Sequence, residues 1–142
     1  MQLPSTDDSF LIRTDFRDDS AWARLCAAVQ EPVGDMRAYV ACVNDRTVED
    51  ASVAQLVNEL AHASKSFFFV ADRKTIDDAE HPILVVDLLQ RPTRSFRVVP
   101  REAWGVENNL SLANMDFDEF AGAADDDGVF RGFRDTGSAG SR

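Results

Sequence analysis

The strongest constraint on the fold of this chain is an alternation of short apolar runs with helical stripes. The runs occupy residues 10–15, 38–43 and 67–72, and each closes on polar residues. Between them, residues 22–29 and 53–60 repeat their apolar side chains at the spacing of one helix face,. Apolar strands without alternation are typical of parallel sheets that helices cover on both faces. The sequence therefore predicts a β-α-β-α-β start.

The pattern changes in the second half of the chain. Residues 83–88 form another apolar run, and residues 95–99 alternate apolar with charged side chains after a turn-like stretch at 90–93. This order predicts an antiparallel hairpin whose second strand is half exposed to solvent. The whole sheet is therefore expected to be mixed.

A last helix is predicted near the C-terminus. Asp116 and Glu119 stand three residues apart, which is the spacing of a capping box,. The helix that follows is expected to cover residues 117–124 and to stop at Gly128, because glycine is the usual residue at a helix C-terminus. The expected fold class is therefore α/β, a mixed sheet completed by a C-terminal helix.

Length and composition indicate one domain. The chain has 142 residues, of which 44% are hydrophobic and ten are phenylalanine, enough to form a core without disulfides,. We expect a single α/β domain over residues 1–133. Residues 134–142 carry no apolar anchor, so they are predicted to be a disordered tail.

The compartment is predicted from two features of the sequence. The longest apolar run, residues 66–71, is too short to cross a bilayer,. The first eight residues contain neither a basic nor an apolar segment of the kind that begins a signal peptide,. We therefore expect a cytoplasmic protein.

The net charge of the chain is strongly negative and unevenly distributed. It amounts to −10, which argues against nonspecific binding to nucleic acid or to anionic membranes,. Residues 102–130 contain eight acidic residues and no Lys or Arg, whereas residues 91–101 contain four arginines. This distribution predicts that the last third of the chain presents an acidic face to a basic protein partner.

An asparagine-rich segment precedes the last helix, at residues 104–117 (WGVENNLSLANMDF). Glycine, asparagine and serine are weak helix formers, so a short helical turn followed by an irregular crossing is expected here. Two interpretations stay open: the asparagines satisfy backbone groups, or they face a partner. The candidate binding residues, from this segment and the acidic stretch after it, are Trp104, Glu107, Asn108, Asn109, Asn114, Asp116, Asp118, Asp125, Asp126 and Asp127.

Aspartates close the first three predicted strands. Asp15, Asp45 and Asp72 would meet at the carboxyl edge of a parallel sheet, where ligands of open α/β sheets bind,. Three converging carboxylates would suit Mg²⁺ or Ca²⁺. The alternative is that the same aspartates cap helices and begin turns.

Other chemistry has little support in the sequence. It contains no nucleophile elbow, phosphate loop or zinc-ligand spacing, and no motif indicates a cofactor,. Cys26 and Cys42 both occupy apolar positions of their predicted elements, so they are interpreted as small buried hydrophobes, with a disulfide or a reactive thiol as the alternative,.

Several stretches together resemble one protein family. They are LPSTDD (3–8), LIRTDF (11–16), FVAD (69–72), HPILVVDL (81–88), FRVVP (96–100) and ENNLSLANMDF (107–117). The chain resembles, over residues 3–133, an uncharacterised family of small acidic proteins from high-GC Gram-positive bacteria, a domain of unknown function. The resemblance implies a soluble bacterial domain, and it implies no catalytic residue.

Three functions follow as hypotheses. The preferred one is a non-catalytic acidic binding protein for a basic partner, of which an immunity-type inhibitor is one form. The second is a metal-dependent or phosphate-handling enzyme built on Asp15, Asp45 and Asp72. The third is a homo-oligomer in which the arginines of residues 91–101 meet the acidic region of a second copy.

Overall fold

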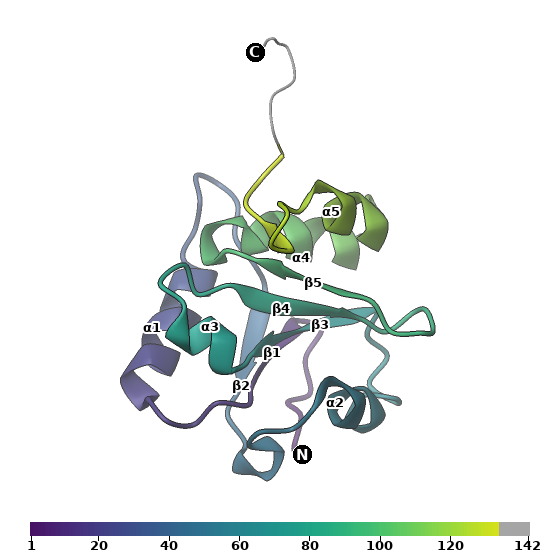
Figure 1. The fold of residues 1–142 in the computed structure, drawn as a ribbon. Helices are drawn as coiled ribbons and strands as arrows, with labels where there is room; N and C mark the ends of the chain where they lie inside the picture. The colour runs from purple at the N-terminus through teal and green to yellow at the C-terminus, as the bar shows by residue number, and fades with distance from the viewer. Residues whose placement is uncertain (134–142) are drawn as a thin grey trace, which may run out of the picture.

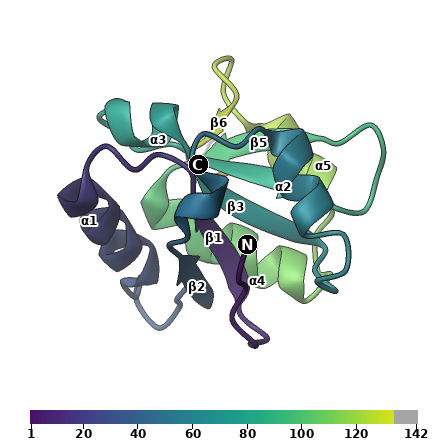
Figure 2. The ribbon, with the colours of Figure 1, turned by 90° about the horizontal axis from the view of Figure 1, so that it is seen from below.

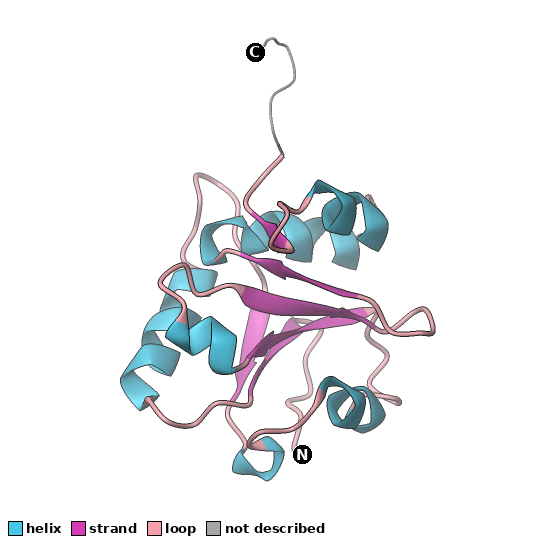
Figure 3. Cartoon of the chain, viewed as in Figure 1, coloured by secondary structure: helices cyan, strands magenta, loops and turns pink. Residues whose placement is uncertain are grey.

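The computed structural model describes residues 1–133 and shows a six-stranded mixed sheet with helices on both faces (Figures 1 and 3). In chain order the elements are β1 (Ser9–Arg13), α1 (Asp19–Gln30), β2 (Val40–Val43), η1 (Arg46–Val48), α2 (Val53–Glu59), β3 (Phe67–Ala71), α3 (Arg73–Asp77), β4 (Ile83–Asp87), β5 (Ser95–Val98), η2 (Pro100–Glu102), α4 (Ala103–Ser111), α5 (Phe117–Ala123) and β6 (Val129–Phe130). The tail predicted at 134–142 lies outside the described residues.

The strand order in the sheet is β2-β1-β3-β4-β5-β6. Strand β1 pairs in parallel with both β2 and β3, which confirms the β-α-β-α-β start. Strands β3, β4 and β5 are antiparallel to one another in turn, which confirms the hairpin. The short strand β6 was not predicted as a strand, and it adds to the edge of the sheet in parallel with β5.

Two hydrophobic clusters fill the space on either side of the sheet. Helices α1, α4 and α5 pack on one face, around side chains such as Leu11 and Phe69. Helix α2 and the 3-10 helix η1 pack on the other face, around Ile12 and Phe68. Neighbouring residues of a strand point to opposite faces, so each apolar run supplies both clusters. Seen from below, α2 lies in front of the sheet and α4 behind it (Figure 2).

The asparagine-rich segment corrects one prediction. Instead of an irregular crossing, η2 leads directly into the regular helix α4. Ala103 and Val106 on this helix are fully buried, and Leu110 packs beside them. Burial of this apolar stripe outweighs the weak helix propensity of glycine and asparagine, because tertiary packing supplies most of the stability of helices in proteins.

The last helix confirms its predicted range and corrects the role of Gly128. The capping box of Asp116 and Glu119 is present and α5 ends at Ala123 with Ala124 as its C-cap, so Gly128 is not the residue that stops the helix. Gly128 has a φ of 81° and closes a turn, in which its N–H donates to the carbonyl of Asp125 at 2.8 Å. The glycine is therefore used to turn the chain into β6, a conformation that L-residues with side chains adopt at a cost.

Candidate functional site

The glutamate of the asparagine-rich segment is a buried structural residue. Glu107 is 4% exposed. Its carboxylate accepts hydrogen bonds from the hydroxyls of Ser9 at 2.9 Å and Ser111 at 2.6 Å, and from the backbone N–H of Tyr39 at 2.8 Å. These bonds join α4 to the start of β1 and to the residue before β2. A buried carboxylate surrounded by donors in this way holds elements together.

The asparagines beside it also serve the backbone. The side-chain N–H of Asn108 donates to the carbonyl of Arg37 at 2.9 Å, which fixes the loop between α1 and β2. Asn109 donates to the carbonyl of Gly105, one turn earlier in α4, at 2.8 Å. These contacts agree with the structural interpretation of the segment.

Two further candidates from this segment lie apart from those contacts. Trp104 is partly buried and packs against the core cluster of α4. Asn114 is exposed, and among the described residues its side chain has no hydrogen bond. Neither position adds a polar group to a common binding site.

Two of the three strand-end aspartates cap helices. Asp45 accepts from the backbone N–H of Thr47 at 3.0 Å, and backbone hydrogen bonds lower the pKa of Asp45 to about 2. Asp72 caps α3 through Thr75 and pairs with Arg97 at 2.7 Å. Burial raises the pKa of Asp72, but Arg97 and Thr75 outweigh it, so the pKa lies below its ordinary value,.

The third strand-end aspartate forms an ion pair. Asp15 is 4% exposed and binds Arg17, whose guanidinium also contacts Asp77 at 2.7 Å. The hydrogen bond from Arg17 lowers the pKa of Asp15. Each of the three carboxylates therefore has a local partner, and two of them cap helices as the alternative interpretation holds. Among residues 1–133 no group of three His, Cys, Asp or Glu side chains is placed to hold a metal ion.

Arginines from outside the acidic stretch at 102–130 form ion pairs with some of its carboxylates. Asp118 pairs with Arg94, whose guanidinium also binds the buried Asp87 at 2.8 Å. Asp116 and Glu119 bond to each other's backbone in the capping box. The arginine-rich hairpin and the acidic region thus meet within one chain, through Arg94, rather than presenting two free surfaces of opposite charge.

A second arginine gathers three carboxylates. Arg131, directly after β6, contacts Glu80 at 2.8 Å, Asp125 at 2.7 Å and Asp127 at 2.7 Å. Hydrogen bonds to Arg131 lower the pKa of both Glu80 and Asp127, and the same bonds raise the pKa of Arg131. Arg131 therefore holds carboxylates from two separate segments of the chain, the connection before β4 and the turn before β6.

Two surface hollows adjoin this cluster. One, of about 370 Å³, is lined by Glu31 and Glu80 over an apolar floor that includes Val33 and Pro100. The other, of about 790 Å³, is lined by the three aspartates 125–127 together with Arg131 and Phe133. The contact between Glu80 and Arg131 joins the two hollows.

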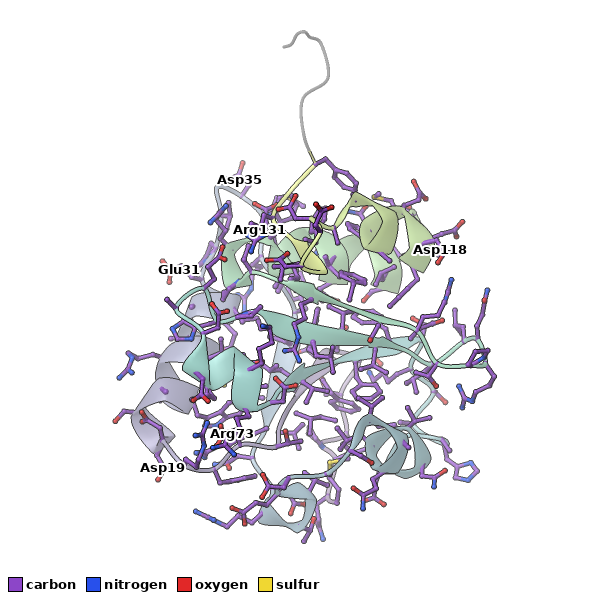
Figure 4. The ribbon with its side chains drawn as sticks, in the orientation of Figure 1. Asp19, Glu31, Asp35, Arg73, Asp118 and Arg131 are labelled. Atoms are coloured by element: carbon purple, nitrogen blue, oxygen red, sulfur yellow. The ribbon has the colours of Figure 1, made fainter. Side chains whose placement is uncertain are left out.

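We call the combined surface the acidic face. It consists of Glu31, Glu80, Asp125, Asp126 and Asp127 with the two arginines Arg101 and Arg131. Figure 4 shows Glu31 and Arg131 on the upper left part of the molecule, away from Asp19 and Arg73 below. Among residues 1–133, Glu31 and Asp126 of this face form no ion pair.

Sequence reasoning found only part of this surface. The aspartates 125–127 were predicted as binding residues, whereas Glu31 and Glu80 were missed. Glu80 lies 51 residues from Arg131 in sequence, and no local pattern indicates that contact. A proline follows Glu31 and another lies near Glu80, so turn chemistry predicts that both glutamates are on exposed connections,. It does not predict that the two glutamates share one surface.

A comparison with protein families matches residues 8–133 to the family described as Domain of unknown function (DUF6924). The chain belongs to this family. The DUF6924 match begins just before β1 and ends just after β6, so it contains the whole sheet and every residue of the acidic face. A search of curated proteins finds no match. Within residues 1–133, no helix is both long and apolar enough to span a membrane.

Proposed function

We propose that this DUF6924 domain is a non-catalytic binding protein that takes a cationic segment of a protein partner on the acidic face. An immunity-type inhibitor of a basic enzyme is one form of this function. The observation that supports it is the pair of exposed carboxylates Glu31 and Asp126, which lie on this face and form no ion pair with another described residue. A lysine or arginine of a partner would pair with them.

The residues around this cluster suit a protein surface as a ligand. Glu31 and Asp126 form no ion pair with another described residue, so both are free to meet a partner's cations. Val33 and Phe133 are 43% and 55% exposed, and they would bury apolar area in the same contact,. Since Arg131 lowers the pKa of Glu80 and Asp127, both stay ionised at neutral pH.

Opposite charge acts mainly on the rate of encounter. A long-range attraction between an acidic face and a basic partner raises the association rate, and added salt screens it. We therefore expect binding that weakens steeply with ionic strength. The apolar floor of the face supplies the part of the affinity that salt leaves unchanged.

The test compares two charge-reversal variants that carry the same change of net charge. Glu31→Lys with Asp126→Lys reverses the face without touching the carboxylates bound to Arg131. Glu49→Lys with Glu59→Lys is the matched control, because these residues follow η1 and end α2, on the side of the sheet opposite to α4 and α5 (Figure 1). Their ion pairs are exposed, and such pairs contribute little to stability,.

Immobilised wild-type protein and both variants are exposed to host lysate at low salt, and retained proteins are eluted with a salt gradient. We expect a basic partner that wild type and the control retain in stoichiometric amount and the face variant loses. Equal retention by all three proteins would refute the acidic face as the site. Recovery of no stoichiometric partner at all would refute the proposed function.

The proposed setting is the bacterial cytoplasm, in accord with the resemblance of the sequence. Cell fractionation of the host, with an antibody against the domain, tests this part separately. Detection of the protein only outside the cell would contradict it without touching the charge argument.

A further inference from the structure

The fold brings the two cysteines of the chain together from different elements. Cys26 lies on α1 and Cys42 on β2. Gln30, one helical turn after Cys26 and on the same helix face, donates to the carbonyl of Val40 at 3.1 Å and lies 3.9 Å from the sulfur of Cys42,. The thiols of Cys26 and Cys42 lie close enough to influence each other's ionisation.

Both thiols remain reachable by a small solute. Cys26 on α1 and Cys42 on the edge strand β2 are each only partly buried. They pack against the margin of the core cluster rather than inside it. Fully enclosed cysteines are inert, whereas partly exposed ones react when their surroundings favour the thiolate.

A buried positive charge stands next to this pair. Arg13, on β1, is 2% exposed, and its guanidinium lies 4.4 Å from the ring centre of Phe16 and 5.6 Å from that of Trp22. Its charge favours ionisation of the Cys26 thiol, but the neighbouring Cys42 and burial outweigh it, so the pKa of Cys26 is raised. Because arginine does not lose its proton in proteins, this influence is permanent.

We propose that Cys26 and Cys42 are a modification site, at which a hydroperoxide oxidises the two thiols to an intramolecular disulfide that joins α1 to β2. The sequence favoured the interpretation of both residues as small buried hydrophobes, with a disulfide or a reactive thiol as the alternative. The contact between them, which no local pattern indicates, is the reason to prefer the alternative.

The electronic environment fits the chemistry. The neighbouring Cys26 thiol lowers the pKa of Cys42, and the nearness of Cys42 raises the pKa of Cys26. The pair therefore gives up one proton readily and holds the second, which leaves one thiolate beside one thiol. This is the arrangement in which a nucleophilic thiol has a resolving thiol at hand.

The reaction with hydrogen peroxide proceeds in two balanced steps. The Cys42 thiolate attacks one peroxide oxygen and breaks the O–O bond, which gives a sulfenic acid and a hydroxide that takes up the proton released by Cys42. The Cys26 sulfur then attacks the Cys42 sulfur, forms the S–S bond, and the hydroxyl leaves as water with the Cys26 proton. The two thiols lose two electrons and two protons, and hydrogen peroxide is reduced to two waters.

The experiment treats the full chain with hydrogen peroxide and follows free thiols and intact mass over time. We expect loss of both thiols together and a mass decrease of about 2 Da, with no larger species. The matched control exchanges two neighbours, Cys26→Ala with Ala27→Cys, which turns the thiol away from β2 because adjacent helix residues do not share a face. We expect its intramolecular disulfide to form at least about tenfold more slowly.

A second pair of variants separates the two sulfurs. In Cys26→Ser, treatment with peroxide should leave a sulfenic acid on Cys42 that a dimedone-type reagent traps. In Cys42→Ser, trapping at Cys26 should be slower. Circular dichroism confirms that each variant is folded before it is treated.

Three results would overturn the proposal. They are persistence of both thiols in wild type under peroxide that oxidises the unfolded chain, formation of intermolecular dimers instead of the internal bond, and equal rates in wild type and the exchanged control. The first two can be read even if a variant fails to fold, because they need only the wild-type protein.

Discussion

Replacement of Glu107 tests whether the asparagine-rich segment is structural. Glu107→Leu keeps a side chain of similar size but removes the acceptors for the N–H of Tyr39 and the hydroxyls of Ser9 and Ser111. The N–H of Tyr39 is fixed, so its lost hydrogen bond costs about 1–3 kcal/mol. The two hydroxyls can rotate toward other acceptors, and we assign each a loss of about 1 kcal/mol.

The total expected loss is therefore about 3–5 kcal/mol of unfolding free energy. This is a large part of the stability of an ordinary domain, which is about 5–15 kcal/mol. Glu107→Gln keeps one oxygen for Tyr39, and its amide can donate to both hydroxyls, since a hydroxyl also accepts. We expect a loss of only about 1 kcal/mol for this variant.

The assay is urea unfolding followed by the fluorescence of Trp22 and Trp104. Asn114→Ala serves as the control within the same segment, because its exposed side chain makes no hydrogen bond with the described residues, and its effect should stay within about 0.5 kcal/mol,. Refutation would come from a Glu107→Leu protein that is as stable as wild type, or no less stable than Glu107→Gln. Either outcome would return Glu107 to the class of recognition residues.

Three further predictions concern stability. The pKa of Asp72 is lowered in the folded state, so its pairing with Arg97 stabilises the protein above about pH 4, and that contribution is lost as the pH falls,. Arg97→Met should therefore be less stable than wild type at pH 7. Urea titrations should show this difference in unfolding free energy shrinking toward about pH 2. The disulfide-linked form proposed above should unfold at higher urea than the reduced form, by about 3 kcal/mol for a loop of this size, and an unchanged midpoint would count against a relaxed native bond. Gly128→Ala should cost about 1 kcal/mol because its φ is 81°, whereas Gly122→Ala, in the exposed part of α5 with open space around it, should stabilise by up to about 1 kcal/mol in thermal unfolding,.

Local patterns predicted most of the fold. The capping box of Ser52 and Gln55 at the start of α2 and that of Asp116 and Glu119 at α5 both depend on residues three apart, so the sequence alone shows them,. The apolar runs predicted the first four strands, because burial on both faces of a sheet leaves little room for polar residues, and the alternation at 95–99 predicted the fifth. Helix α4 was missed, since its stability comes from packing of Ala103 and its neighbours on the sheet rather than from propensity.

The functional surface was predicted only in part, for a related reason. A high negative charge is visible in the composition, but which carboxylates stay free depends on where the arginines lie in space. Arg94 forms an ion pair with Asp118, so this carboxylate is not free to bind a partner. Arg131 forms an ion pair with Glu80, which lies in the connection between α3 and β4. Contacts between residues so far apart leave no periodic signal in the chain.

The amino-acid sequence by itself determined the α/β class, the places of the first five strands along the chain and the starts of α2 and α5, because these follow from side-chain periodicity and from hydrogen bonds between near neighbours. Tertiary structure alone decided that the three strand-end aspartates stay apart, that one arginine holds three carboxylates, and that Cys26 meets Cys42. Those contacts join different elements, and only the packing of the elements on the sheet fixes the distances on which charge and reactivity depend.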